Sequence, residues 1–591
     1  MDRYRHSRTP SQSSPISVPI SLKLHLLLPI FTVLTAFGPG FQSIITFTWL
    51  WFTLSIFYIR HITRWWYIFF YYMFVNIGTL IAFMVTMKAE VSHAYALTFA
   101  VGMVINLLGL TSLLMDRFAQ RVFDSKGWAR VMTFPCVWTG LWTLFTYNWI
   151  LGDWGNYAFV FLGMEEIMQL ASFTGIGGIN FILAWSGPIG SDILVNWLNT
   201  HVYPINSETS STNTTGSTGI DDTIAEVDHI SSTDDILTTQ NNRRQRRPNF
   251  TIPTLFSSLF IYLTIIFLVI TYGSIRMSTA LIPFFQRSVA EFAPTSLLNV
   301  GCVIRQEQII PDNSVYIQTT QELAKNGSKI ILWTEGSGTM KNQSELDAVI
   351  SSIKNISSTY NAYIGVAYIF LGESKETSYN KLTVISSSGE IVMDYQKSHL
   401  VPFLETVRFR SGKAELQTYD SKEYGVIGGA ICFDFNFPGF INQASSKKVN
   451  LMLEVSNTWG NYFSYLLFKF FSSIYIYICP VGVLHSRSNA IRSIENGFTL
   501  IRCNGDGISG VWGPQGQSFH SIPTTNLQGS VSGQTSFTFQ VPLYSRVNTV
   551  YGIFKDTFGW ICLGMSGIFL ICMIILEKGS LRWRTFVKKW F

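Results

Sequence analysis

The sequence predicts a polytopic α-helical membrane protein of about eight spans that carries one large α/β domain outside the cytoplasm. The 591-residue chain is 48 % hydrophobic and only 13 % charged, about half the charged share of an ordinary soluble domain. Eight of its segments are apolar enough to cross a bilayer. The long stretch between the seventh and eighth segments has the short apolar runs that are typical of an α/β domain.

The eight segments approach the length of about 20 mostly apolar residues that a membrane-spanning helix needs. They are residues 22–40, 42–59, 65–86, 93–115, 131–151, 174–198, 252–273 and 557–576. The first two are short, and only the turn-forming stretch Gly38–Gly40 separates them. We therefore expect these two segments to form a helical hairpin.

The distribution of Lys and Arg predicts the orientation, because cytoplasmic loops are enriched in basic residues. With eight spans, every basic cluster falls on the same side of the membrane. The clusters are Arg3, Arg5 and Arg8; Arg60 and Arg64; Arg117, Arg121, Lys126 and Arg130; Arg243, Arg244, Arg246 and Arg247; and Lys578, Arg582, Arg584, Lys588 and Lys589. We therefore expect an integral, multi-pass protein with both termini in the cytoplasm. Residues 274–556 then lie outside it, in a lumen, a periplasm or the cell exterior.

The remaining boundaries follow from changes in composition. We expect a disordered cytoplasmic N-terminus (1–21), six spans (22–198), a disordered cytoplasmic insert (199–250), a seventh span (251–273), a linker (274–296), the α/β domain (297–545), a C-terminal span (557–576) and a basic cytoplasmic tail (577–591). The insert is rich in Ser, Thr, Asn and Asp and has too few apolar residues to offset chain ordering. It is either a tolerated loop, a phosphorylated segment or a lipid-binding basic patch.

Residues 297–545 contain apolar runs that alternate with helical stretches. The predicted strands are LLNVGCVI, KIILWTE, AYIGVAYIF, KLTVISS, EIVMDYQK, GVIGGAICFD, VNLMLEVSN, TLIRCNG and GVWGPQG, and the predicted helices are 313–326 and 341–359. Buried strands that alternate with helices predict a packed sheet.

Three polar residues stand where three of these strands end: Glu335 after ILWT, Lys397 after VMDYQ and Cys432 after GGAI. Together they could perform nucleophilic catalysis. A carboxylate can take the proton of a thiol, the thiolate can attack a carbonyl carbon, and an ammonium group can stabilise the resulting oxyanion. Spacing alone leaves open that Cys432 is a buried small side chain and that the two charged residues are solvated.

The motifs around these residues resemble the nitrilase superfamily, which has a Glu–Lys–Cys triad, and within it the apolipoprotein N-acyltransferase family. The matching segments are DYQKSHLVPFLE (Asp394–Glu405), GGAICFDFNFP (Gly428–Pro438), VSNTWG (Val455–Gly460), HSRSNAIRSIENGFTLIRCNGDGISGVWGPQG (His485–Gly516) and LASFTGIGGINFILAW (Leu170–Trp185). The resemblance covers most of residues 20–580. It implies a nitrilase-like αββα sandwich as the extracytoplasmic domain.

The resemblance also implies roles for individual residues. Cys432 would be the nucleophile, Glu335 the general base, Lys397 the oxyanion support and Glu405 a second carboxylate of the pocket. The remaining supporting residues would be Phe433, Asp434 and Trp459. The family moves an acyl chain from a phospholipid to the cysteine as a thioester, and then to the amine of a lipoprotein. We thus expect a phospholipid donor, an amine or lipoprotein-like acceptor and a membrane as partners.

The sequence departs from the family at several points. Phe433 stands where the family has tyrosine, Asp434 stands where it has glutamate, and the chain between Glu405 and Gly412 is short. The apolar segment 461–484 is extra and is either a membrane-dipping loop or a gene-model error. Two alternative functions stay open: an amidase of the same superfamily, in which water resolves the thioester, and a catalytically silent membrane scaffold.

Other signals are weaker. The sequons at Asn326, Asn342 and Asn355 suggest a glycoprotein of a eukaryotic secretory pathway. The seven cysteines, at irregular spacing, predict neither a disulfide framework nor a zinc site. No phosphate-binding loop or histidine cluster predicts a cofactor or a metal. The net charge of +6 is small for this length, so we expect no nucleic-acid partner.

Overall fold

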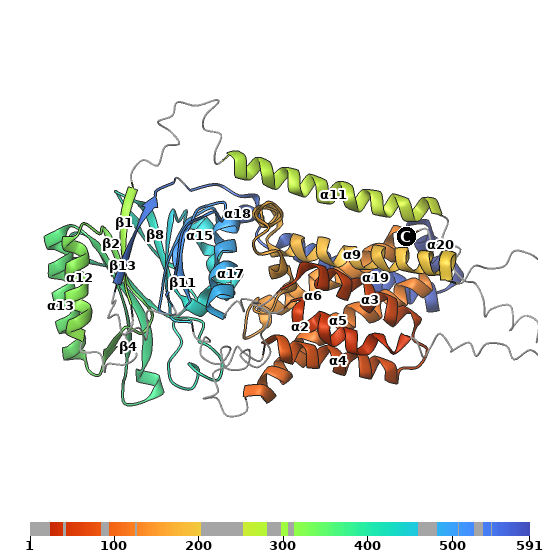
Figure 1. Ribbon diagram of the computed structural model, residues 1–591, viewed down its shortest axis with the longest axis horizontal. Helices are drawn as coiled ribbons and strands as arrows, with labels where there is room; N and C mark the ends of the chain where they lie inside the picture. The colour runs from red at the N-terminus through yellow and green to blue at the C-terminus, as the bar shows by residue number, and fades with distance from the viewer. Residues whose placement is uncertain are drawn as a thin grey trace, which may run out of the picture.

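The computed structural model describes residues 24–39, 43–83, 94–124, 127–202, 252–279, 297–304, 313–458, 481–505, 507–524, 536–544 and 546–590. A helical bundle and a two-sheet domain lie end to end in it (Figure 1). A helix is present at each of the eight predicted spans: α2 (Leu27–Phe37), α3 (Ile45–His61), α4 (Trp66–Phe83), α5 (Ala94–Val122), α6 (Trp128–Asn148), α9 (Ile176–Trp197), α11 (Ile252–Thr279) and α19 (Thr557–Lys578).

Several of these helices could cross a membrane. Within the described residues, five helical stretches are long and apolar enough: Trp66–Phe83, Ala96–Val122, Ile176–His201, Ser257–Ser278 and Thr557–Lys578. Helix α2 is apolar but has only 11 residues, or about 16 Å of helix, roughly half of the hydrocarbon thickness. The count of eight spans therefore stays a prediction.

A buried cluster of four charges joins α3, α5, α6 and α9. Arg60 lies 2.7 Å from both Asp116 and Asp192, and Arg130 lies 2.7 Å from Asp192. Two basic residues that mark the cytoplasmic side in the sequence are therefore neutralised by carboxylates. Such pairing lets charges lie among packed helices without the full cost of desolvation.

The α/β domain has two sheets. The first contains β1 (Leu297–Val303), β2 (Ile330–Trp333), β3 (Gly338–Met340), β4 (Tyr363–Phe370), β5 (Tyr379–Ile385), β6 (Ile391–Gln396) and β13 (Ser536–Pro542), in the order β13-β1-β2-β4-β5-β6, with β3 on β4. The second contains β7 (Gln417–Ser421), β8 (Gly425–Ile431), β9 (Leu451–Ser456), β10 (Thr499–Asn504), β11 (Ile508–Trp512) and β12 (Ser518–Pro523), in the order β12-β11-β10-β9-β8-β7. All nine predicted strands are present.

Helices cover the outer face of each sheet, so the layers are α–β–β–α, as expected. Helices α12 (Asn313–Lys325) and α13 (Gln343–Tyr360) pack on the first sheet. Helix α17 (Val481–Asn496) packs on the second and lies between that sheet and the helical bundle (Figure 1). Asn342 caps α13 by accepting a hydrogen bond from the Glu345 backbone N–H at 2.9 Å.

The four strands that the sequence analysis did not predict lack long apolar runs. Strands β7 (QTYDS) and β12 (SFHSIP) are polar edges of the second sheet. Strand β13 (SFTFQVP) has alternating burial and pairs with β1 in antiparallel fashion. The predicted basic tail contains a further helix, α20 (Leu581–Trp590). The predicted N-terminus, insert and linker lie mostly outside the described residues. The exceptions are the helical residues 199–202 at the start of the insert range and residues 274–279 of the linker range, which continue α11 beyond the predicted end of the seventh span.

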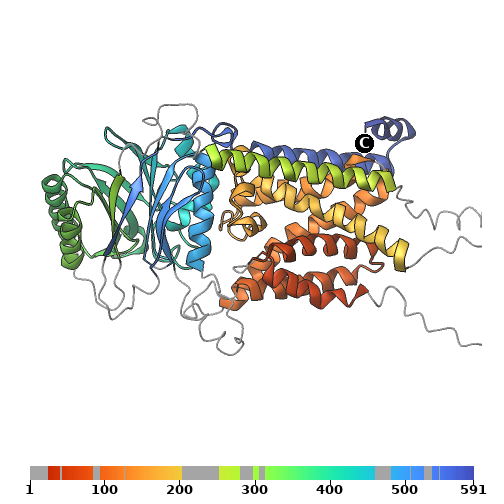
Figure 2. The same ribbon diagram turned by 45° about the horizontal axis from the view of Figure 1, so that its top comes forward.

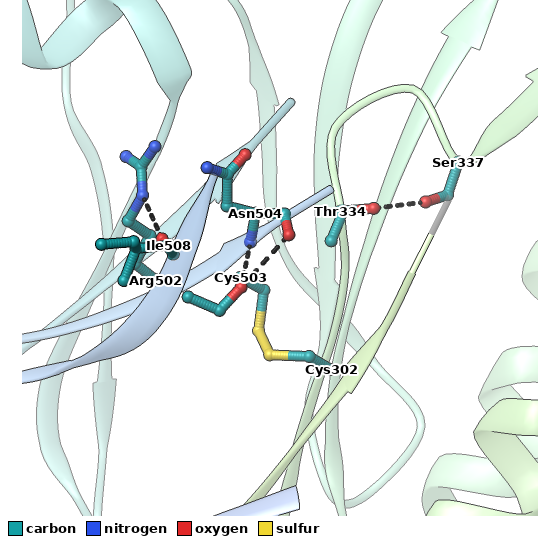
Figure 3. Close-up of a disulfide and its surroundings, with 8 residues drawn as sticks. Cys302, Thr334, Ser337, Arg502, Cys503, Asn504 and Ile508 are labelled. Carbon is teal, nitrogen blue, oxygen red and sulfur yellow. Dashed lines mark hydrogen bonds between the residues drawn. A yellow bond between two sulfur atoms is a disulfide. The ribbon is translucent and has the colours of Figure 1, made fainter. Parts of the chain in front are cut away.

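A disulfide joins the two sheets, and this corrects the expectation drawn from the cysteine spacing. Cys302 of β1 and Cys503 of β10 are bonded, with 5.7 Å between their Cα atoms (Figure 3). Their separation of 201 residues gives no local pattern in the sequence. Only the stacking of β1 against β10 brings them together.

Candidate active site

The three predicted catalytic residues stand at strand ends, as expected. Glu335 comes two residues after β2, Lys397 directly follows β6, and Cys432 directly follows β8. The first two belong to one sheet and the third to the other. Because the sheets pack face to face, these ends meet inside the sandwich.

Lys397 lies between two carboxylates. Its Nζ is 2.7 Å from Oε1 of Glu335 and 2.7 Å from Oε2 of Glu405. The lysine side chain is only 1 % exposed. The structure therefore brings together the predicted triad lysine, its glutamate and the second pocket carboxylate.

Neutral donors complete the hydrogen bonding of the two glutamates. The side-chain amide of Asn380 donates to Oε1 of Glu335 at 2.9 Å and to Oε1 of Glu405 at 3.4 Å. The Asn457 backbone N–H donates to Oε2 of Glu335 at 3.0 Å, and the Val401 backbone N–H donates to Oε2 of Glu405 at 2.8 Å. Both carboxylates are therefore fixed in orientation.

The electrostatics of this cluster favour a charged lysine. Burial disfavours the ammonium group, but Glu335, Glu405 and Cys432 together raise the pKa of Lys397 well above its ordinary value. Burial also raises the pKa of Glu405, against the opposing charge of Lys397. A fixed and buried ammonium is suited to stabilising an oxyanion.

Cys432 occupies a left-handed turn at the end of β8. Its φ is 47°, a conformation that is rare outside glycine and common at functional turns. The side chain is buried, and burial together with Glu335 raises the pKa of the Cys432 thiol to about 12. The resting group is therefore a thiol, which needs a base before it can attack.

Asp434 connects the turn Cys432–Asn436, here called the cysteine turn, to residues 395–399 around Lys397. It is fully buried and accepts hydrogen bonds from the backbone N–H groups of Ile431 and His399 and from the hydroxyls of Tyr395 and Ser398, at 2.8–3.1 Å. Tyr395 and Ser398 flank Lys397 closely in the chain. Asp434 thus positions both segments without facing the cavity.

An open cavity of about 150 Å³ leads from the helical bundle to Cys432. Its lining is mostly apolar and includes Phe83 of α4, Val101 and Ile105 of α5, Trp154, Leu404 and Phe433. Phe433, which stands where the resembled family has tyrosine, therefore adds an apolar wall to the cavity. The predicted residue Trp459 lies outside the described residues.

The cysteine turn rests directly on a loop of the helical bundle. The Asp153 backbone N–H donates to the carbonyl of Asn436 at 2.9 Å. Arg492 of α17 donates to the carbonyl of Phe435 at 3.1 Å and forms ion pairs with Asp153 and Glu495. The turn of Cys432 is therefore held by contacts to both parts of the chain.

A second buried group of polar residues, not predicted from the sequence, lies beside the site. Arg502 forms an ion pair with Glu454, and both are fully buried. Arg502 also donates to Nδ1 of His485 at 3.1 Å. His485 and Arg502 lie in a segment that carried the family resemblance, and that was the available signal. In the described part of the chain, no three or more His, Cys, Asp or Glu side chains are grouped so as to hold a metal ion.

The chain is similar in sequence to several known proteins. A family model described as carbon-nitrogen hydrolase matches residues 304–536. Apolipoprotein N-acyltransferase 2 of Treponema denticola is 22 % identical over 488 residues, which cover 75 % of this chain and 77 % of that protein. Apolipoprotein N-acyltransferase of Rickettsia typhi is 22 % identical over 403 residues, which cover 64 % of this chain and 65 % of that protein. Among solved structures, an amidase from Nesterenkonia sp. aligns at 16 % identity and a TM-score of 0.34, over 45 % of this chain and 95 % of its own.

The fold and the matching domain define a carbon-nitrogen hydrolase type of enzyme. Residues 304–536 match the carbon-nitrogen hydrolase domain of the nitrilase superfamily. Within that superfamily, the predicted resemblance of the chain to the apolipoprotein N-acyltransferases is confirmed, since relatives of that name match well over half of the chain. An acyltransferase or hydrolase role of this superfamily follows.

Proposed function

We propose that the chain is a membrane-bound N-acyltransferase, which moves a phospholipid acyl chain through a Cys432 thioester to an amine. The observation that carries this proposal is the apolar cavity that joins α4 and α5 to Cys432. A hydrolase of small polar amides gains nothing from an apolar opening between helices that could lie in a bilayer. A lipid ester can enter such an opening with its acyl chain against apolar side chains, since the burial of each CH₂ group contributes about 0.8 kcal/mol.

The first half of the reaction forms the thioester. Glu335 takes the proton of the Cys432 thiol, and the sulfur attacks the ester carbonyl carbon of the donor. The ammonium of Lys397 stabilises the oxyanion that develops. The ester C–O bond then breaks, and the lysophospholipid leaves as an alcohol with the proton that Glu335 returns.

The second half transfers the acyl chain. A neutral amine attacks the thioester carbonyl, and Glu335 accepts a proton from the attacking nitrogen. The C–S bond breaks, the amide is released, and the thiol is restored by that proton. Glu405 keeps Lys397 in place throughout, because it holds the other side of the same ammonium group.

The catalytic domain is proposed to lie outside the cytoplasm. Charge distribution supports this placement, and so does the buried disulfide, because such bonds persist in oxidising compartments. The C-terminus lies at the end of the bundle away from the two-sheet domain, as the orientation requires (Figure 2). The sequons Asn326, Asn342 and Asn355 are exposed on that domain, so a glycosidase-sensitive shift in mass, lost in their Gln variants, would test the placement in a eukaryotic host.

Mass spectrometry of the purified protein tests the chemistry. After incubation with phospholipid vesicles, we expect an acyl group on Cys432 that hydroxylamine removes, and none on the Cys432→Ser variant. Adding a peptide with a free N-terminal amine should discharge the thioester and yield an acylated peptide. Release of free fatty acid instead would identify a hydrolase, and the absence of any adduct would support the scaffold.

A further inference from the structure

His485 lines the same cavity as the proposed nucleophile. It lies on α17, is 2 % exposed, and faces the apolar space that Cys432 and Phe433 also border. Among the described residues that line this cavity, Cys432 and His485 alone carry titratable side chains. The mechanism described above does not use His485.

The hydrogen bonding of His485 defines its tautomer. Nη2 of Arg502 lies 3.1 Å from Nδ1 of the imidazole. A guanidinium can only donate, so Nδ1 must accept, and a neutral imidazole then carries its hydrogen on Nε2. Arg502 itself is held by its ion pair with Glu454 and by the carbonyl of Ile508 at 3.1 Å (Figure 3).

The imidazole stays neutral in this position. Burial and the nearby Lys397 ammonium lower the pKa of His485 to about 3. Arg502 adds a second positive charge on the Nδ1 side, while Glu454 is already paired with Arg502. The ring centroid of Trp154 lies 6.3 Å away on the bundle side. His485 is therefore uncharged near neutral pH, and in this state it can donate a fixed hydrogen bond.

We propose that His485 is a further substrate-binding residue, whose Nε2–H donates a hydrogen bond to an oxygen of the donor's ester group in the cavity. The inference rests on the proposed acyl transfer and names the group that recognises the ester. The ester must reach Cys432, and His485 borders the same space. A preorganised donor acts most strongly where charge develops on an oxygen in a site that excludes water. Lys397 and His485 would then both act on the reacting group.

Two variants distinguish the hydrogen bond of Nε2 from that of Nδ1. In His485→Gln the amide nitrogen reaches the Nε2 position and can still donate, whereas in His485→Asn the side chain reaches only the Nδ1 position, beside Arg502. We expect His485→Gln to form the Cys432 thioester within about fivefold of the wild-type rate. His485→Asn should be slower by about 100-fold, the usual loss of one oxyanion donor.

A second reagent shows whether any loss is merely structural. Methyl methanethiosulfonate reacts with the same thiol by attack at sulfur, so no carbonyl oxygen becomes charged. Its reaction with Cys432, followed on the same peptide by mass spectrometry, should be nearly equal in wild type and both variants.

The outcomes are distinct. Thioester formation at the wild-type rate in His485→Asn, or equal losses in both variants, would overturn the role of His485 while leaving acyl transfer intact. If His485→Asn slows the methanethiosulfonate reaction as much as it slows thioester formation, the role of His485 is structural only. Failure of the wild type to form a thioester would overturn the proposed function and this inference with it.

Discussion

Gly152 of the helical bundle touches the backbone of Asn436 in the cysteine turn. A Cβ at Gly152 would lie 2.1 Å from the carbonyl oxygen of Asn436, and the φ of Gly152 is +60°. Beside it, the Asp153 backbone N–H donates to that same oxygen. The turn that carries Cys432 is thus seated on the bundle by a contact that only glycine allows.

Gly152→Ala should therefore weaken the contact between the cysteine turn and the helical bundle. The left-handed conformation alone costs an alanine about 1–2 kcal/mol. In addition, the alanine Cβ would clash with the carbonyl oxygen of Asn436, and only a shift of the backbone can remove this clash. We expect a lower unfolding temperature in detergent and at least tenfold slower thioester formation.

Gly163→Ala is the matched control. Gly163 has a φ of +98° and lies in the same region between α6 and α9, but no atom is within 4 Å of its Cβ position. This variant should lose only the stability that the left-handed conformation costs an alanine, and it should form the thioester at the wild-type rate. Equal behaviour of the two variants would show that the contact with Asn436 is unimportant.

Much of the catalytic cluster could be predicted from the sequence, because the signal is local. Glu335, Lys397 and Cys432 each follow an apolar run, and such runs become buried strands whose ends can meet. Glu405 and Asp434 were predicted from the family motifs around these three residues. The roles of all five remain proposals, although the structure brings them to one place.

The polar group behind the site could not be predicted in the same way. Its members lie on three different elements: His485 on α17, Arg502 on β10 and Glu454 on β9. Only tertiary packing therefore shows that Arg502 contacts both His485 and Glu454. Periodicity in a single segment does not reveal such a group. Arg60 and Arg130, which are predicted to lie on the cytoplasmic side, are a similar case, because their acidic partners lie on other helices.

Asn380→Asp should block acylation. The Asn380 amide donates to both Glu335 and Glu405, and these already share the one ammonium of Lys397. An aspartate would replace a donor by a third negative charge, so one of the carboxyl groups would have to take a proton or move. We expect thioester formation to fall by at least tenfold.

Asn342→Asp is the corresponding control on the same domain. Asn342 caps α13 through its side-chain oxygen, and aspartate caps helices equally well. Its rate should stay within twofold of the wild type. A wild-type rate in Asn380→Asp would mean that the bridging amide is not needed for the chemistry.

The junction between the bundle and the domain should make stability depend on pH. Burial raises the pKa of Asp153 to about 6 and that of Glu495 to about 7, against the opposing charge of Arg492. Between the unfolded and folded pKa values the folded state holds more protons, so this contribution to stability is complete below about pH 4 and is lost as pH rises through 6 to 7.

Unfolding measured from pH 5 to pH 8 checks that sign. Glu495→Gln removes one raised carboxyl group, so it should lose less stability over this range than the wild type, by a difference on the order of 1 kcal/mol. Glu322→Gln, on the exposed face of α12, should retain the wild-type slope. A steeper fall in Glu495→Gln would contradict the assigned direction.

Removing the disulfide should destabilise the protein and disturb the site. Cys302 lies on β1, which pairs with the β2 strand that leads to Glu335, and Cys503 directly follows Arg502 on β10. The bond thus ties together two walls of the sandwich. Loss of a bond that closes so long a loop typically costs about 2–5 kcal/mol.

The double variant Cys302→Ala/Cys503→Ala should show that loss by thermal unfolding, and it should also form the thioester more slowly. Cys432→Ala removes a buried thiol but keeps the bond, so its unfolding temperature should change much less. Labelling of the denatured, unreduced wild type with a thiol reagent gives a direct check. The peptides of Cys302 and Cys503 should remain unlabelled until reductant is added, and their labelling without it would show that the two thiols are free.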